Sequence, residues 1–410
     1  MWYTGIDWAD DHHDAVVIDA TGQVLLTLRV DHTAAGLASL TAALTQITGP
    51  DARDQLACIV EINHGLLIAS LLDAGFPVYP VNPKTVDRRR GAAGAKTDQI
   101  DAYLLAKTGR SDLTDLRRLI PDSPLLQELK VLTRDQDGLI RSQTRLVNQL
   151  TACLKAYYPV ALQLFSKLQQ PTTMAFLRAY PTLEAAGAAS VDAIRQTLKE
   201  AGHSRAAQVA PSIWQTLQQE QLLADAVITR TKARLMLALL DQLQPLLLQI
   251  AAYDQEITRL FVNHPDCGLF VSLPRAGQRL APRLSAEVGD DHTRYADATS
   301  LQALAGTAPV MFQSGTYAKA HRRYACLKSL RNALQQFAWQ STLQEAWALA
   351  YYQHKRAAGK SHAVAVRALA NVWVRIIYAM WRDHRPYRST TFTDAQQQQQ
   401  REVAQARRTA

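Results

Sequence analysis

The order of short apolar segments in the first 81 residues constrains the fold more than any other feature of the chain. Segments rich in β-branched and aromatic residues predict strands, and an apolar residue at every third or fourth position predicts a helix. Only short polar stretches such as Thr21-Gly22 separate the first three strands, which predicts antiparallel pairing. The predicted elements are strands over residues 3–6, 15–18 and 24–30, a helix over 34–47, a strand over 56–60, a helix over 65–74 and a strand over 76–81.

This order of elements is that of the ribonuclease H-like fold. In that fold, acids on the first strand, after the fourth strand and on a later helix converge and bind two metal ions that serve phosphodiester chemistry. Asp7 ends the first predicted strand, and Glu61 ends the fourth. We expect Asp10, Asp11 and Asp14 to be solvated instead, because they fall in a loop or at the start of the second strand.

The segment AKTDQIDAYLLA, residues 95–106, supplies the acids of the later helix. Thr97 is a suitable N-cap, and we expect Gly109 to end the helix. Asp98 and Asp101 are three residues apart and therefore lie on one helical face, where they could share a divalent cation. The alternative is an ordinary solvated helix face that carries two acids.

A basic, glycine-rich stretch, KTVDRRRGAAGAK, leads into this helix over residues 84–96. It is either a flexible solvated connector or a loop that grips phosphates beside the metal site. The residues of the second interpretation are Lys84, Arg88, Arg89, Arg90 and Lys96.

The net charge of +9 and the isoelectric point near 9.4 suggest a polyanionic partner, most often a nucleic acid. Residues 298–382 carry eleven Lys and Arg but a single acid, Glu345, so this region accounts for the whole excess of positive charge.

Four widely separated cysteines, without a CxxC motif, predict buried reduced thiols rather than a zinc site or disulfides. No signal peptide and no apolar run of transmembrane length is recognisable, so we expect a cytoplasmic protein without a membrane partner.

Residues 112–260 are predicted to be mostly helical. An amphipathic helix covers residues 125–157, and four heptads of apolar residues predict a coiled coil that Pro245 kinks or splits. Such a seam serves either dimerisation or packing within the chain. Its positions are Met236, Leu239, Leu243, Leu246, Ile250, Tyr253, Ile257 and Leu260.

The C-terminal region begins at residues 269–280, which faintly resemble a helix–hairpin–helix in which only Gly277 supports the hairpin. Further on, Ser314-Gly315 is expected to form a tight turn, and several basic residues follow it in the sequence. Ser314 is therefore either a turn residue or a nucleophile on phosphorus. The basic residues expected to contact nucleic acid beside Gly315 are Lys319, Arg322, Arg323, Lys328 and Arg331. An apolar helix over 364–381 is expected to pack this domain.

Taken together, these motifs resemble the IS110/IS1111-type transposases of bacterial insertion sequences, recombinases guided by a bridge RNA. The resemblance covers nearly the whole chain. It is carried in the N-terminal part by GIDWA, VEINHG, VNPKTV and AKTDQIDA, and in the C-terminal part by SLPRAG, LQALAGTAPVMFQSG, LRNAL, YYQHKRAAGK and AVRALANVWVRIIYAM.

The resemblance implies that Asp7, Glu61, Asp98 and Asp101 fill the family's DEDD tetrad, which binds Mg²⁺ or Mn²⁺, and that Ser314 is its catalytic serine. It further implies a composite active site in a dimer or tetramer, with acids from one protomer and the serine from another. A noncoding bridge RNA would pair with donor and target DNA, and the protein would act in the bacterial cytoplasm, associated with the nucleoid during transposition. The chain departs from the family at Pro274-Arg275-Ala276-Gly277, where relatives commonly carry Pro-Gly-Ile-Gly.

We therefore expect an α/β plus α protein. Its parts are an RNase H-like (RuvC-like) domain over residues 1–112, a helical coiled-coil linker and oligomerisation region over 113–264, a mostly helical transposase domain over 265–388 and a tail over 389–410 that is disordered or a marginal helix. The leading functional hypothesis is a DNA recombinase. The alternatives are a metal-only RuvC-like nuclease, in which Ser314 is structural, and a non-catalytic nucleic-acid-binding protein.

Overall fold

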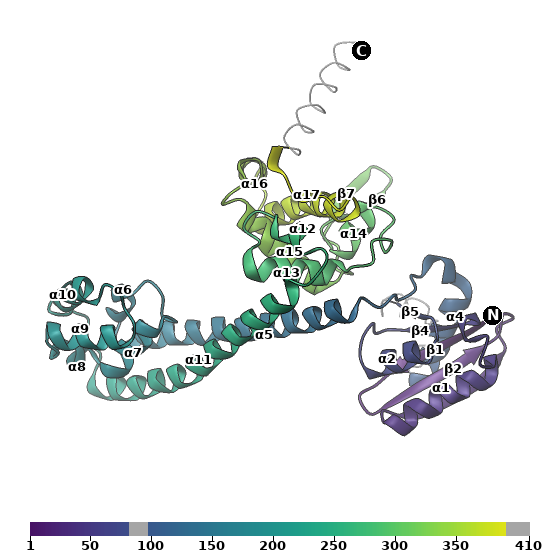
Figure 1. The fold of residues 1–410 in the computed structure, drawn as a ribbon, viewed down its shortest axis with the longest axis horizontal. Coiled ribbons are helices and arrows are strands. Elements are labelled where there is room, and N and C mark those ends of the chain that lie inside the picture. Colours follow the sequence, from purple (N-terminus) through teal and green to yellow (C-terminus); the bar gives the residue numbers. More distant parts are fainter. Residues whose placement is uncertain (82–96, 391–410) are drawn as a thin grey trace, which may run out of the picture. The chain divides into compact units, whose positions relative to one another are not determined.

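A computed structural model describes residues 1–81 and 97–390 of the chain. The chain divides into two compact units, Met1–Pro121 and Asp122–Ala410, which are described separately below (Figure 1).

The first unit is built on a five-stranded mixed sheet in the order β3-β2-β1-β4-β5. The first three strands pair antiparallel, whereas β4 is parallel to β1 and β5 is parallel to β4. The predicted ribonuclease H-like fold is confirmed. The elements are β1 (Trp2–Trp8), β2 (His12–Ile18), β3 (Val24–Asp31), α1 (Ala34–Thr48), β4 (Leu56–Val60), α2 (Leu66–Asp73), β5 (Val78–Pro80) and α4 (Asp98–Asp112), with short 3-10 turns at Arg53–Gln55 and Leu113–Asp115.

Helices cover both faces of this sheet. Side chains of alternate strand residues, such as Ala15 and Val17, pack in one buried cluster with residues of α1 and α2. Val16 and Ile18 lie in a different cluster with Ala102 and Ala106 of α4. Because both faces are covered, all five residues of β4 are buried.

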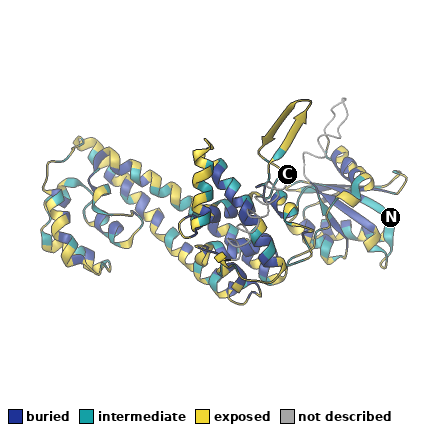
Figure 2. Ribbon diagram, turned by 90° about the horizontal axis from the view of Figure 1, so that it is seen from above, coloured by how far each residue is buried: buried dark blue, intermediate teal, exposed yellow. Residues whose placement is uncertain are grey.

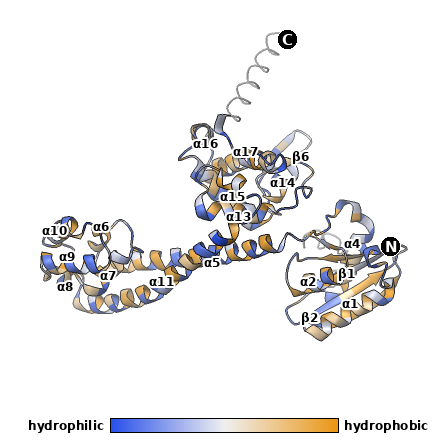
Figure 3. Cartoon of the chain, in the orientation of Figure 1, coloured by the Kyte–Doolittle hydropathy of each residue, from blue (hydrophilic) through white to orange (hydrophobic). Residues whose placement is uncertain are grey.

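The second unit contains a long helical hairpin made of α5 (Pro124–Tyr157) and α11 (Ala226–Phe261). The two helices run antiparallel, because Cys153 hydrogen-bonds to Lys232 while Gln136 hydrogen-bonds to Asp254. Hydrophobic residues lie along both helices (Figure 3). The predicted heptad seam packs against α5 of the same chain, with Leu243 and Ile250 almost fully buried.

Pro245 neither ends nor divides α11, which runs through it as one helix of 36 residues. The expectation of a split was wrong. Proline removes a single backbone donor, and here the packing of the apolar seam keeps the helix continuous on both sides.

A small cluster of helices is inserted in the sequence between α5 and α11. Its core contains Phe176, Leu177, Ile194 and Leu198, together with Met236 of α11. The inserted helices are α6 (Ala161–Leu164), α7 (Pro171–Ala179), α8 (Leu183–Gly187), α9 (Val191–Glu200) and α10 (Ala206–Leu217).

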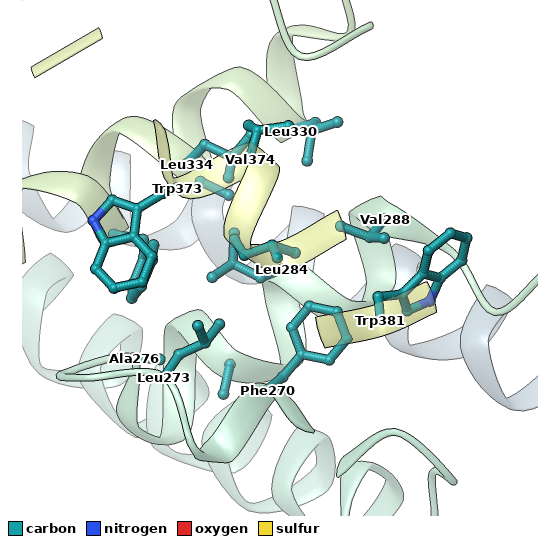
Figure 4. Close-up of a cluster of buried hydrophobic side chains, with 14 of the residues drawn as sticks. Phe270, Leu273, Ala276, Leu284, Val288, Leu330, Leu334, Trp373, Val374 and Trp381 are labelled. Carbon is teal, nitrogen blue, oxygen red and sulfur yellow. The ribbon is translucent and has the colours of Figure 1, made fainter. Parts of the chain in front are cut away.

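The C-terminal domain packs around α17 (His362–Arg382), whose apolar face confirms the predicted packing helix. Figure 4 shows Trp373 and Trp381 of this helix in one cluster with Phe270 and Leu284. The other elements are α12 (Cys267–Val271), α13 (Gly277–Val288), α14 (Ala298–Leu304), β6 (Val310–Ser314), β7 (Tyr317–His321), α15 (Lys328–Ser341) and α16 (Ala346–Ala357).

Ion pairs fix α5 to this domain. Arg134 of α5 donates two hydrogen bonds of 2.8 and 2.9 Å to the fully buried carboxylate of Glu287, and Arg283 donates a 2.8 Å bond to Asp137. These buried charges are thus paired across the helix interface.

By length and composition alone, α11 and α17 could cross a membrane. Each uses its apolar face inside the protein, α11 against α5 and α17 in the domain core. Buried core helices such as α17 also meet these criteria, so two candidate helices are only weak evidence for a membrane span.

The four cysteines are free thiols. Cys58 and Cys153 are buried as expected, and burial raises the pKa of both thiols. Cys267, the first residue of α12, and Cys326, between β7 and α15, are only half-buried, so the expectation of burial was wrong for these two.

Candidate active site

Helix α4 packs closely on the sheet because each side contributes a glycine to the contact, Gly5 on β1 and Gly109 on α4. A Cβ on Gly5 of β1 would lie 1.9 Å from the carbonyl oxygen of Ala102, and a Cβ on Gly109 would lie 2.2 Å from Cδ1 of Ile59. Gly109 therefore does not end the helix, as the sequence suggested, but lies inside it at a point of close packing.

Asp7 and Glu61 occupy the same end of neighbouring strands. Ile6 and Val60 are register partners in the parallel pair of β1 and β4, and Asp7 and Glu61 are the residues that directly follow them. Both side chains are half-buried. Glu61 directly follows β4, as predicted, whereas β1 continues through Asp7 to Trp8, so the predicted strand end before Asp7 was wrong. The two carboxylates are still carried by adjacent strands at the same end of the sheet.

The acids of α4 lie toward this same end of β1. Along α4, Gly109 is near Tyr3 and Ala102 is near Gly5, so the helix approaches Asp7 toward its N-terminus. Asp101 directly precedes Ala102 and is 5% exposed, which places a carboxylate on the sheet-facing side. Thr97 caps the helix as predicted, because its side chain accepts a hydrogen bond from the backbone N–H of Ile100.

Asp98 is exposed and belongs to a cluster with the half-buried His12 and the buried Asp14. The sequence did not reveal this cluster. Its Oδ2 lies 3.4 Å from Nε2 of His12 and 3.6 Å from Nη2 of Arg29. Asp14 shares both partners, at 3.7 Å from His12 and 2.7 Å from Arg29. One ligand atom from each of His12, Asp14 and Asp98 lies within 4.8 Å of the others, so this group could hold a metal ion.

Asp14 is 5% exposed, so the expectation that it is solvated was wrong. Strand β2 begins at His12, earlier than predicted, and pairs Asp14 directly with Asp7 of β1. Arg29 of the next strand neutralises the buried carboxylate with a two-pronged ion pair. Asp10 and Asp11 are exposed, as expected.

The carboxylates of the cluster stabilise positive charge on the side chains beside them. The hydrogen bond to Asp11, followed by that to Asp98, raises the pKa of His12, and the hydrogen bond to Asp14 raises the pKa of Arg29. An open cleft of about 580 Å³ adjoins the cluster and is lined by Asp14, Thr27, Arg29, Thr97, Asp98 and Gln99. Carboxylate oxygens are the ligands that Mg²⁺ and Mn²⁺ prefer.

Ser314 lies in the second unit, at the end of an exposed two-stranded hairpin. Ser314 pairs with Tyr317, so Gly315 and Thr316 form the turn. Gly315 has φ +56°, the positive value that a type II′ hairpin turn requires at its first central position. The hairpin is the exposed antiparallel pair of strands in Figure 2, and all of β7 is exposed.

The cations expected around Ser314 are distributed along the chain that follows it. Lys319 lies opposite Phe312 in the hairpin, whereas Arg322 and Arg323 follow the end of β7. Lys328 and Arg331 lie in the first turn of α15. The hairpin therefore separates the serine hydroxyl from the arginines near its base.

The other predicted basic residues, Lys84, Arg88, Arg89, Arg90 and Lys96, lie outside the described residues, as does the tail from residue 391.

Comparisons with known proteins cover both units. Two family sequence models match: one described as a transposase of the DEDD IS110 type over residues 4–159, and one described as the transposase IS116/IS110/IS902 family over residues 267–353. The chain is 32% identical over 380 residues to the mini-circle putative transposase for IS117 of Streptomyces coelicolor, covering 90% of this chain and 91% of that protein. It is 28% identical to an insertion element IS900 uncharacterized 42 kDa protein of Mycobacterium paratuberculosis, covering 96% of this chain and 98% of that one.

Among solved structures, T. thermophilus RuvC in complex with a Holliday junction substrate matches 29% of this chain and 99% of its own, at 16% identity and a TM-score of 0.23.

Proposed function

The chain belongs to the IS110 family of insertion-sequence transposases, and on this basis we propose that it is an RNA-guided DNA recombinase whose acidic tetrad and serine act together. The observation that carries the proposal is the placement of Asp7 and Glu61 on adjacent strand ends, with Asp101 on the helix packed across them. A donor set made only of carboxylates fits Mg²⁺ or Mn²⁺.

In this proposal Asp7, Glu61, Asp98 and Asp101 hold the metal ions. Bound Mg²⁺ or Mn²⁺ would stabilise charge on the phosphate oxygens and favour deprotonation of an attacking hydroxyl. Asp14 and Arg29 then act as positioning residues, since Arg29 lies within ion-pair distance of both Asp14 and Asp98.

Ser314 is the proposed nucleophile. Its Oγ attacks phosphorus and loses its proton, a P–O bond of the DNA strand breaks, and one strand end leaves as a free hydroxyl while the other remains esterified to the serine. Attack by the hydroxyl of a different strand reverses these steps and completes the exchange. Exposure of Ser314 at a hairpin tip supports access to a DNA strand.

The partners follow from family membership. We propose that a noncoding bridge RNA pairs with donor and target DNA, and that the protein recognises the shape and the backbone of this RNA rather than its sequence. The active assembly is a dimer or tetramer that works in the bacterial cytoplasm, at the nucleoid. The heptad seam does not supply the oligomer contact in this proposal, because it packs within the chain.

The decisive experiment is a denaturing gel of the protein with its cognate RNA, Mg²⁺ and labelled donor DNA. We expect a covalent protein–DNA adduct with the wild type and with Thr316→Ala, a matched change in the same exposed turn, but none with Ser314→Ala. Asp98→Ala should abolish cleavage and adduct together. Cleavage of equal extent in wild type and Ser314→Ala, without an adduct, would overturn the serine step and leave a metal-only nuclease.

A further inference from the structure

Three connections of the C-terminal domain bring an aspartate and two histidines together. Asp266 lies just before α12, His292 lies between α13 and α14, and His384 follows α17. One ligand atom from each of the three lies within 4.8 Å of the other two. Nε2 of His292 is 3.1 Å from one carboxylate oxygen of Asp266, and Nδ1 of His384 is 3.9 Å from the other. The three residues are far apart in the chain, so no motif in the sequence predicts the cluster.

These separations are close to those between two ligands of one metal ion. Bonds of about 2.0–2.1 Å to a tetrahedral zinc ion place neighbouring ligand atoms about 3.3 Å apart. The two nitrogen–oxygen distances of the cluster, 3.1 and 3.9 Å, lie on either side of this value. Two imidazoles and one carboxylate are also a donor set that zinc accepts when the protein supplies three ligands and the fourth position stays open. The side chain of His384 is 64% exposed, so solvent can reach that position.

Aromatic packing holds His292 in place before any ion binds. Its ring stacks on Trp381 with a centroid distance of 4.4 Å and an interplanar angle of 18°, and it lies 4.2 Å from the ring of His384. Trp381 itself is part of the domain core (Figure 4). Nδ1 of His292 is buried and has no hydrogen-bond partner among the described residues, so Nε2 is the nitrogen that faces Asp266. A ring fixed in this way is a preorganised ligand.

The backbone positions the other two ligands. The N–H of Asp266 donates a 3.1 Å hydrogen bond to Nδ1 of the buried His264. His384 has φ +50°, and the N–H of Arg385 bonds to the carbonyl oxygen of Met380 at 3.0 Å, a helix ending in which glycine usually takes the left-handed position. Such backbone strain is concentrated at functional sites. A histidine in the place of a glycine therefore needs an explanation, and its approach to Asp266 supplies one.

We propose that Asp266, His292 and His384 bind a divalent transition-metal ion, with Zn²⁺ as the best match to the donor set. The ion ties the end of α17 to the connections before α12 and after α13. This site goes beyond the proposed function and does not depend on it. Its two nitrogen ligands also distinguish it chemically from the acidic tetrad, since Mg²⁺ favours oxygen ligands and zinc accepts imidazole.

The first test is a calorimetric titration of the untagged, full-length protein with Zn²⁺, in a large excess of Mg²⁺ that occupies carboxylate sites. We expect one Zn²⁺ site of the wild type to weaken by at least about 10-fold in His384→Gly and in Asp266→Asn, since even residues that only support a metal ligand have effects of this size. His354→Gln, an exposed change on α16, is the matched control and should bind as the wild type does. A loss of Zn²⁺ binding confined to His12→Gln would place the ion at the acidic cluster and overturn the proposal.

The second test is the melting temperature in EDTA and in Zn²⁺. His384→Gly should melt near the wild type in EDTA, because glycine adopts the left-handed backbone without strain, so any loss of binding is not a loss of fold. Zn²⁺ should raise the melting temperature of the wild type and of His354→Gln more than that of His384→Gly. Equal Zn²⁺ affinities and equal Zn²⁺ effects in all three proteins would overturn the site. Neither test involves DNA cleavage, so the recombinase proposal and this one can fail separately.

Discussion

Gly5 and Ala102 are in backbone contact: a Cβ on Gly5 would lie 1.9 Å from the carbonyl oxygen of Ala102. This contact brings α4 down onto β1 next to Asp101. The absence of a single side chain therefore positions the acids of the helix relative to Asp7.

Gly5→Ala should destabilise the protein by about 1–3 kcal/mol, because α4 must move off the sheet to make room for the methyl group. Metal-dependent cleavage should fall further than the loss of folded protein explains. Urea unfolding and a cleavage assay measure the two effects. Gly138→Ala is the control, since a Cβ there meets open space on α5 and a gain of up to about 1 kcal/mol is expected. Equal behaviour of the two variants would contradict the packing argument.

Asp14→Asn should lower stability by about 1–3 kcal/mol, because Arg29 loses a charged, two-pronged acceptor beside a buried strand. Urea unfolding checks this value. Asp10→Asn, an exposed change in the preceding loop, should stay within about 0.5 kcal/mol of the wild type. A neutral result for Asp14→Asn would mean that the ion pair has no net effect on stability.

Glu287→Met should cost about 2–4 kcal/mol, because it leaves Arg134 unpaired at a buried helix interface, although Arg134 keeps some contact with water. Combining it with Arg134→Met should recover much of the loss, since the buried charge is then gone. Denaturant unfolding of the single and double variants measures the coupling. Simple additivity of the two changes would show that the pair does not act as a unit.

Arg275→Gly should stabilise the protein slightly or leave it unchanged, by about 0–1 kcal/mol. Arg275 has φ +60°, a left-handed conformation that costs most residues about 1–2 kcal/mol, whereas the flexibility of glycine in the unfolded chain offsets part of the gain. Thermal unfolding checks this value. Clear destabilisation would instead indicate that the Arg275 side chain makes a contact that matters.

Stability should fall as the pH drops below about 6.5, the ordinary pKa of histidine, in part because of His264. Burial lowers the pKa of His264, with His292 acting in the same direction and Asp266 and Asp290 opposing it. Its Nδ1 also accepts the backbone N–H of Asp266 at 3.1 Å, a bond that protonation of Nδ1 would break. The unfolded chain therefore takes up the proton before the folded one does.

Urea midpoints at about pH 7.5 and about pH 5.5 test this prediction. We expect His264→Gln to lose less stability on acidification than the wild type. His354→Gln, at an exposed position on α16, should retain the loss seen in the wild type. The explanation fails if His264→Gln is as acid-sensitive as the wild type.

The strand order and the placement of Asp7 and Glu61 were predictable, because an acid that ends an apolar strand needs only local information to be located. The burial of Asp14 was not predictable, since it depends on pairing with Asp7 and on Arg29 from another strand. Gly109 was misjudged because a glycine that ends a helix and one that packs against Ile59 look alike in sequence. The heptads were recognised, but their partner, α5, is distant in the chain.

The connection between the two units is short, and its length affects how the chain would bind nucleic acid. Leu119 is held to Val78 in the first unit, and Ser123 is held to Asp290 in the second. The chain between Leu119 and Ser123 has a contour length of about 14 Å, estimated from the reach of an extended chain. If both units bind the same nucleic acid, as we propose, this short connection makes the second binding event intramolecular, so that its effective concentration is high and avidity increases without any further contact.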